Sequence, residues 1–122
     1  MAGIVAKWSE VREIMLPSIE RTHGTHDEDS VVAMLMVGKA KLWTFAESAC
    51  VTEVIEYPLV KAFNLWLVGG KLEEVLAQEP VMAAYAAGIG CKRLTAGGRE
   101  GWTRVAPDGW KQTGVLFYKD IG

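Results

Sequence analysis

The chain has 122 residues and a mass of 13.4 kDa; half of its residues are apolar, and 13 basic and 15 acidic side chains give a net charge of −2. A monomer of this size buries roughly two-thirds of its unfolded surface, which supports one hydrophobic core and not two. The balanced charge excludes an intrinsically disordered chain and a general polyanion binder. The apolar runs are too short for a membrane span, and no secretory signal pattern opens the sequence. We therefore expect a single domain over residues 1–122 with no membrane partner and a cytoplasmic location.

The first predicted helix covers residues 9–21, where apolar residues recur at helical spacing and Ser9 can cap the N-terminus. Pro17 lies inside this run and is expected to kink or restart the helix, because proline lacks an N–H group and clashes with the preceding turn. Residues 2–7 could supply at most a short strand before it.

A polar loop with two histidines, His23 and His26, precedes the second predicted helix. Thr25 and Glu28 have the spacing of a capping box, so this helix should begin there and end near Val37. The histidines and the neighbouring acids could suggest a metal site, but no third and fourth ligand is evident. We interpret the segment as a solvated loop with helix-capping acids.

Three strands are predicted next, over residues 41–48, 50–57 and 61–68, with turns short enough for an antiparallel meander. Residues 61–68 are apolar on both faces, which is typical of a central strand covered by helices. Two cysteines, Cys50 and Cys91, each fall near the start of a predicted strand. We interpret them as small, buried, unpaired side chains, which suits a reducing compartment.

The glycine pair Gly69-Gly70 ends the third strand, and a long helix to about residue 88 should follow, bent near Leu76 by Pro80. Residues 91–96 are then a strand, and the strand–helix–strand order favours a parallel crossover. The remaining predictions are a short helix over residues 98–105, a turn at 107–109 and a last strand over 113–121.

This order of elements resembles the GNAT (Gcn5-related N-acetyltransferase) fold. The segment Gly98-Arg99-Glu100-Gly101-Trp102, followed by Arg104-Val105, is similar to short GNAT-like proteins of tailed bacteriophages, and Leu42-Trp43 and residues 67–70 fit the same pattern. The resemblance implies an α+β domain with a mixed, mostly antiparallel sheet, helices on both faces, and a first strand that is missing or reduced. It covers about residues 9–121.

The resemblance also implies where acetyl-CoA would bind, since GNAT enzymes hold its pyrophosphate on backbone N–H groups between the central strand and the long helix. Here the positions are Gly69, Gly70 and Lys71. The glycine spacing departs from the family signature, and Glu73 and Glu74 occupy the first helical turn, where they would repel a phosphate. We therefore expect no cofactor, and acetyl-CoA only if the chain is an enzyme.

Glu53 is the best-placed general base if the chain is an acyltransferase, since the resemblance implies a glutamate on the central strands. The alternative is a surface carboxylate paired with Lys61 or an arginine. The family's acid tyrosine would fall near Trp102, and an indole cannot protonate a thiolate leaving group. The chemistry thus fails at the position where it is needed.

Five tryptophans are many for a chain of this length. Trp43 and Trp66 fit the core, whereas Trp8, Trp102 and Trp110 cannot all be buried easily. Exposed tryptophan and arginine are typical of protein contacts, so Trp8, Arg99, Trp102 and Trp110 are candidate interface residues. The basic residues interleaved with Trp102 and Trp110 are too few to predict nucleic-acid binding.

Two hypotheses follow. The favoured one is a non-catalytic GNAT-like domain that binds protein, either other virion proteins or itself, as a phage virion or assembly component in the host cytoplasm or the virion. The alternative is an acyl-CoA-dependent N-acyltransferase with an atypical cofactor loop.

Overall fold

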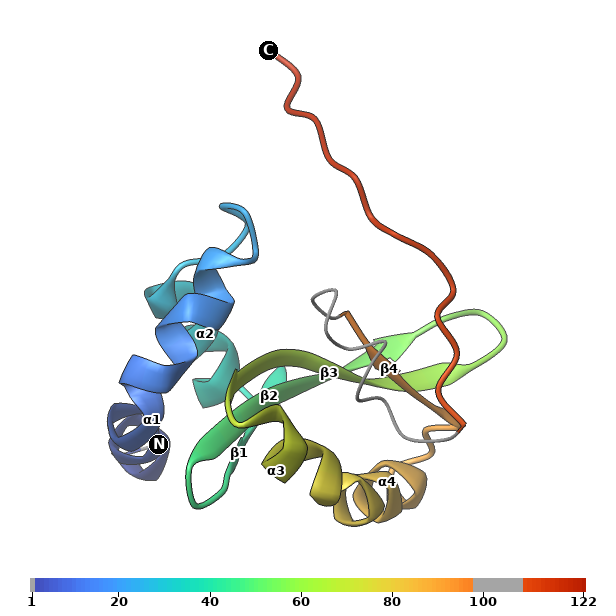
Figure 1. Ribbon diagram of the computed structural model, residues 1–122, viewed down its shortest axis with the longest axis horizontal. Coiled ribbons are helices and arrows are strands. Elements are labelled where there is room, and N and C mark those ends of the chain that lie inside the picture. Colours follow the sequence, from blue (N-terminus) through green and yellow to red (C-terminus); the bar gives the residue numbers. More distant parts are fainter. Residues whose placement is uncertain (1, 98–108) are drawn as a thin grey trace.

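The computed structural model describes residues 2–97 and 109–122, and these form an α+β fold built on one four-stranded sheet (Figure 1). The elements in chain order are α1 (Ala2–Glu20), α2 (Glu28–Met36), β1 (Ala40–Thr44), β2 (Ser48–Glu56), β3 (Lys61–Gly70), α3 (Leu72–Ala77), α4 (Glu79–Gly88) and β4 (Arg93–Ala96). The predicted class, a mixed and mostly antiparallel sheet with helices, is confirmed.

The strand order is β1-β2-β3-β4, with antiparallel pairs β1–β2 and β2–β3 and the parallel pair β3–β4. The meander, the parallel crossover and the interior position of β3 are therefore confirmed. The register shifts once: Val51 pairs with Leu67 and Thr52 with Leu65, so Trp66 is an extra residue on β3. Such a bulge bends the strand and increases its twist.

Helices cover the sheet on both faces, and each pair has its own hydrophobic cluster (Figure 1). One cluster joins α1 and α2 to the sheet and includes Met15, Val31, Ala49, Val51 and Leu67. The other joins α3 and α4 to the opposite face and includes Cys50, Phe63, Leu65, Val75 and Met82. Neighbouring strand residues point to opposite faces, so β3 needs apolar residues on both sides.

The first helix differs from its prediction at both points that depended on local signals. It begins at Ala2, not at Ser9, and the Ser9 hydroxyl donates to the carbonyl of Val5 within the helix. Residues 2–7 are thus helical rather than a reduced strand. The helix also continues through Pro17 to Glu20. The Met15 side chain two residues earlier is fully buried, so tertiary packing holds this turn in place despite the missing N–H group.

The predicted long helix is two helices, α3 and α4, that meet at Gln78. Pro80 lies in the first turn of α4, where proline is tolerated because the first N–H groups of a helix have no partner. The bend expected near Leu76 is therefore a break two residues later. Tyr85 of α4 is partly exposed.

The C-terminal predictions have different outcomes. Arg99, Trp102 and the helix predicted over residues 98–105 lie outside the described residues. The strand predicted over residues 113–121 is wrong, because this segment is extended and pairs with no strand in the part of the chain that the structure describes. Figure 1 shows it in red, projecting away from the sheet. Among the described residues, no helix has the length and apolar character needed to cross a membrane.

Candidate functional site

The predicted cofactor loop lies at the end of β3, and its two glycines are explained by close packing. A Cβ atom at Gly69 would clash with the backbone of Ile14 in α1 and lie 2.7 Å from the sulfur of Met15. Gly70 has a positive φ of 85°, and a Cβ there would clash with the backbone carbonyl of Glu47. Both positions therefore need glycine for the fold.

Lys71, the third residue of this loop, forms an ion pair with Glu47 at 2.6 Å, which raises the pKa of the lysine. Glu74 accepts hydrogen bonds from the hydroxyl of Ser48 and, at 2.9 Å, from the backbone N–H of Glu47. The Ser48 bond is the larger cause of a lowered Glu74 pKa. Glu73 adds a further carboxylate, so acidic groups surround the one lysine.

This arrangement does not fit a pyrophosphate. The helix that follows, α3, has only six residues and begins at Leu72 without a side-chain cap. Anion binding at a helix N-terminus needs free N–H groups and a favourable local charge. Here the acidic side chains of the same turn supply negative charge, and the cation is already paired.

Glu53 lies on β2 and is part of a row of three polar side chains across the sheet. Its carboxylate accepts from the amide of Asn64 at 3.1 Å, and the Asn64 carbonyl oxygen accepts from the hydroxyl of Thr95 at 2.9 Å. Glu53 pairs with Asn64 in the register, and Asn64 with Thr95, so the row links β2, β3 and β4. Among the described residues the hydrogen-bond partner of Glu53 is therefore an amide, and Lys61 instead donates to the carbonyl of Ile89.

This row gives each of the three polar side chains a hydrogen-bond partner. The amide of Asn64 can both donate to the carboxylate of Glu53 and accept from the hydroxyl of Thr95. General base catalysis needs a substrate proton within hydrogen-bond reach of the carboxylate. In the described residues Glu53 has no acidic or basic partner. The row of Glu53, Asn64 and Thr95 is typical of a hydrogen-bond network that stabilises a sheet.

Trp8, a candidate interface residue, lies in the core with 4% of its surface exposed, so its predicted place at a protein contact is wrong. Its indole N–H donates to Glu28 at 2.8 Å, and Arg12 binds both oxygens of the same carboxylate. These bonds lower the pKa of Glu28, chiefly through Arg12. Trp8, Arg12 and Glu28 together join α1 to α2.

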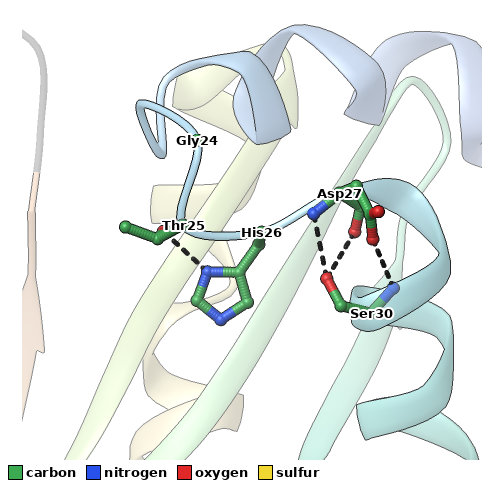
Figure 2. A pocket seen from close by; sticks show the side chains of 5 residues that line it. All are labelled: Gly24, Thr25, His26, Asp27 and Ser30. Atoms are coloured by element: carbon green, nitrogen blue, oxygen red, sulfur yellow. Dashed lines mark hydrogen bonds between the residues drawn. The ribbon is translucent and has the colours of Figure 1, made fainter.

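Glu28 is thus not part of the helix cap predicted from Thr25. The observed cap of α2 begins one residue earlier than Glu28, at Asp27, whose carboxylate accepts from the N–H of Ser30 at 2.8 Å, while the Ser30 hydroxyl accepts from the N–H of Asp27 (Figure 2). Serine replaces the expected glutamate in the reciprocal bond.

The histidine loop beside this cap forms a shallow depression (Figure 2). Its two imidazoles have separate neighbours: His26 bonds the Thr25 hydroxyl and lies 4.5 Å from the ring of Trp66, and His23 lies 5.2 Å from the ring of Tyr118. In the described residues no three His, Cys, Asp or Glu side chains form a group that could hold a metal ion.

Trp110 is the second residue of the described range 109–122. Its indole N–H donates to Glu79 of α4 at 2.6 Å, and its ring packs against the cluster that contains Phe63. Trp110 is therefore partly buried, and its bond to Glu79 holds this part of the chain on α4.

The feature that sequence reasoning missed is the exposure of this segment. Leu116 is 94% exposed and Phe117 87%, and Val115, Tyr118 and Ile121 are also largely exposed. The sequence carries this signal as a short apolar run, and such a run predicts a strand without indicating which neighbour it pairs with. We call residues 113–121 the C-terminal segment below.

No family model, no curated protein and no solved structure matches this chain.

Proposed function

We propose that this chain is a non-catalytic domain with a GNAT-like fold that acts by binding protein, as a virion or assembly component of a bacteriophage. One observation carries the proposal: the C-terminal segment exposes five large apolar side chains within seven residues. Exposed apolar groups at this density are typical of surfaces that a partner covers. An isolated chain would gain nothing from placing them in water.

The cofactor loop supports the non-catalytic part of the proposal. Each of its three residues already has a structural role, Gly69 against α1, Gly70 against the β1–β2 turn and Lys71 in an ion pair with Glu47. A pyrophosphate would need to displace Glu47 and to tolerate Glu73 and Glu74. The loop where the resemblance would place the cofactor therefore gives no support to the acyltransferase alternative.

The phage assignment rests on the resemblance of residues 98–102 and of the order of elements to short phage-encoded GNAT-like proteins. Under this proposal the protein works in the host cytoplasm or in the virion, and its partners are other virion proteins or a second copy of itself. Mass spectrometry of purified particles of the encoding phage should then detect it.

A thermal-shift titration separates the proposal from the acyltransferase. Acetyl-CoA at about 1 mM should leave the melting temperature unchanged, because a ligand stabilises a protein only when its concentration approaches its dissociation constant. A dose-dependent rise that Lys71→Ala removes, and that the control Lys39→Ala on another exposed lysine retains, would overturn the proposal in favour of acyl-CoA binding.

A further inference from the structure

The C-terminal segment has the pattern of a strand that is covered on both faces. Val115 and Phe117 fall on one side of an extended chain and Leu116 and Tyr118 on the other, so both sides are apolar. Such a pattern is typical of strands inside a sheet with helices on both faces, as in β3. In this structure the segment has no strand beside it among the described residues.

A place that suits such a strand exists at the outer edge of β4. β4 pairs only with β3 within residues 2–97 and 109–122, so no strand of the described residues occupies its other edge, where N–H and C=O groups can pair with a further strand. Beside it, α4 and β4 line an open hollow of about 190 Å³, formed by the small or apolar side chains Ala83, Ala86, Ala87, Cys91 and Leu94 together with the basic residues Lys92 and Arg93. A strand added to β4 would direct alternate side chains into this hollow.

The donor and the acceptor also match in length. β4 has four residues, and the apolar run Val115–Tyr118 has four. The segment does not follow the β4 edge of its own chain: Trp110 is bound to α4 through Glu79, and Tyr118 lies against His23 in the loop between α1 and α2. Figure 1 shows the C-terminal segment, in red, running away from the sheet.

The donor segment offers apolar side chains that a contact would remove from water. Leu116 is 94% exposed, Phe117 87% and Val115 72%, and burial of such side chains drives association. Because the chain carries both a donor strand and an acceptor edge, two copies can satisfy each other in a closed, two-fold arrangement.

We propose that two copies of this chain form a dimer by reciprocal strand addition, in which the C-terminal segment of each copy pairs with β4 of the other and places Leu116 or its neighbours in the α4–β4 hollow. The inference rests on the proposed function, because it names the partner as a second copy and the contact as main-chain pairing with apolar anchors.

Light scattering coupled to size exclusion tests this with the full chain. The wild type should give twice 13.4 kDa at high micromolar concentration and dissociate on dilution. Leu116→Asp should weaken the dimer at least about tenfold, because it places a charge in an apolar contact. The matched control is Leu59→Asp in the β2–β3 turn, since Leu59 is 97% exposed and equally apolar; it should leave the dimer intact.

A mixing experiment shows whether the contact is between copies. Ala87→Trp fills the hollow and should also give a monomer, since Ala87 is exposed and tolerates the change. A mixture of Leu116→Asp and Ala87→Trp proteins retains one intact donor and one intact acceptor, so part of the dimer mass should return. Circular dichroism of each variant checks that it is folded.

A wild type that is monomeric at every concentration, equal weakening by Leu59→Asp and Leu116→Asp, or no recovery in the mixture would each overturn the dimer. These failures are distinct from failure of the proposed function, which the acetyl-CoA titration decides. A monomer that acetyl-CoA does not stabilise would contradict the strand exchange alone.

Discussion

Two apolar segments of this chain have similar patterns and opposite surroundings. β3 and the C-terminal segment both alternate apolar side chains to the two sides of an extended backbone. In β3, Phe63 and Leu65 are each 1% exposed because strands lie on both edges and helices on both faces. In the C-terminal segment, Leu116 and Phe117 face water. The comparison shows that the apolar pattern of a segment tells which of its faces can be buried. Whether those faces are buried depends on the strands and helices that pack beside it.

The sharpest comparison of the two regions is a matched pair of phenylalanine truncations. Phe63→Ala removes a fully buried ring and should lower the free energy of unfolding by about 3–5 kcal/mol. Phe117→Ala removes an exposed ring and should change it by less than about 0.5 kcal/mol in dilute protein. Urea denaturation of both variants measures this. Equal losses would mean that the C-terminal segment belongs to the core.

The close packing at the C-terminal end of β3 can be tested by substituting Gly69. Gly69→Ala forces a methyl group against the backbone of Ile14 and should cost about 1–3 kcal/mol. Gly88→Ala is the matched control: it lies in the last turn of α4 with open space around it and should be neutral or stabilising by up to about 1 kcal/mol. Thermal unfolding compares them. An unchanged Gly69→Ala protein would leave the packing explanation of this loop without support.

The contact between α1 and α2, which cover β3 on one face, should make the free energy of unfolding depend on pH. Arg12 and Trp8 hold the pKa of Glu28 below its ordinary value, so the folded state binds this proton less readily than the unfolded state. Glu28 therefore contributes stability above the unfolded pKa of about 4.5, and the contribution is lost as pH falls through the lower folded value.

Glu28→Gln should reduce stability at pH 7 by about 1 kcal/mol and flatten its decline between about pH 5 and 3. Glu20→Gln, at an exposed position on α1, serves as the control and should leave the decline as it is in the wild type. Denaturant melts across this pH range give the comparison. A Glu28→Gln profile that overlays the wild type would contradict the role of the carboxylate in joining α1 to α2.

Thiol reactivity gives the smallest effect on stability and the clearest contrast in exposure. Cys50 and Cys91 are buried free thiols, as expected from sequence, and burial raises the pKa of Cys50 to about 12. Both should react slowly with a maleimide in the folded protein. Leu116→Cys should add one thiol that reacts rapidly in dilute solution. Intact-mass measurement follows the maleimide adducts over time. Fast labelling of Cys50 and Cys91 in the folded protein would show that the core opens.

The middle of the fold was predictable because its signals are local and mutually consistent. Residues 50–57 and 61–68 are two strand-forming runs separated by a short turn, and this predicts the antiparallel hairpin that the structure shows. The parallel position of β4 followed from the helical segment between it and β3. The same logic identified β3 as an interior strand.

The errors occurred where several local solutions compete or where a distant neighbour is needed. Asp27 with Ser30 displaced the cap expected from Thr25, a shift of two residues between equally plausible hydroxyl and carboxylate pairs. Trp8 looked like a surface residue, because sequence could not show that α1 extends to Ala2 and turns this indole toward Glu28. Within the candidate site, the glycines of the cofactor loop were visible, but their contacts with α1 and the β1–β2 turn were not.

The most direct test of the central claim is amide hydrogen exchange of residues 113–121 as a function of protein concentration. We expect these amides to exchange freely in dilute protein and to become protected as concentration rises, because their hydrogen bonds form with β4 of a second copy. β3 amides should be protected at every concentration. Protection of residues 113–121 that does not depend on concentration would mean that the segment pairs within its own chain, and free exchange at all concentrations would mean that it does not pair with a second copy. Either result would contradict the account.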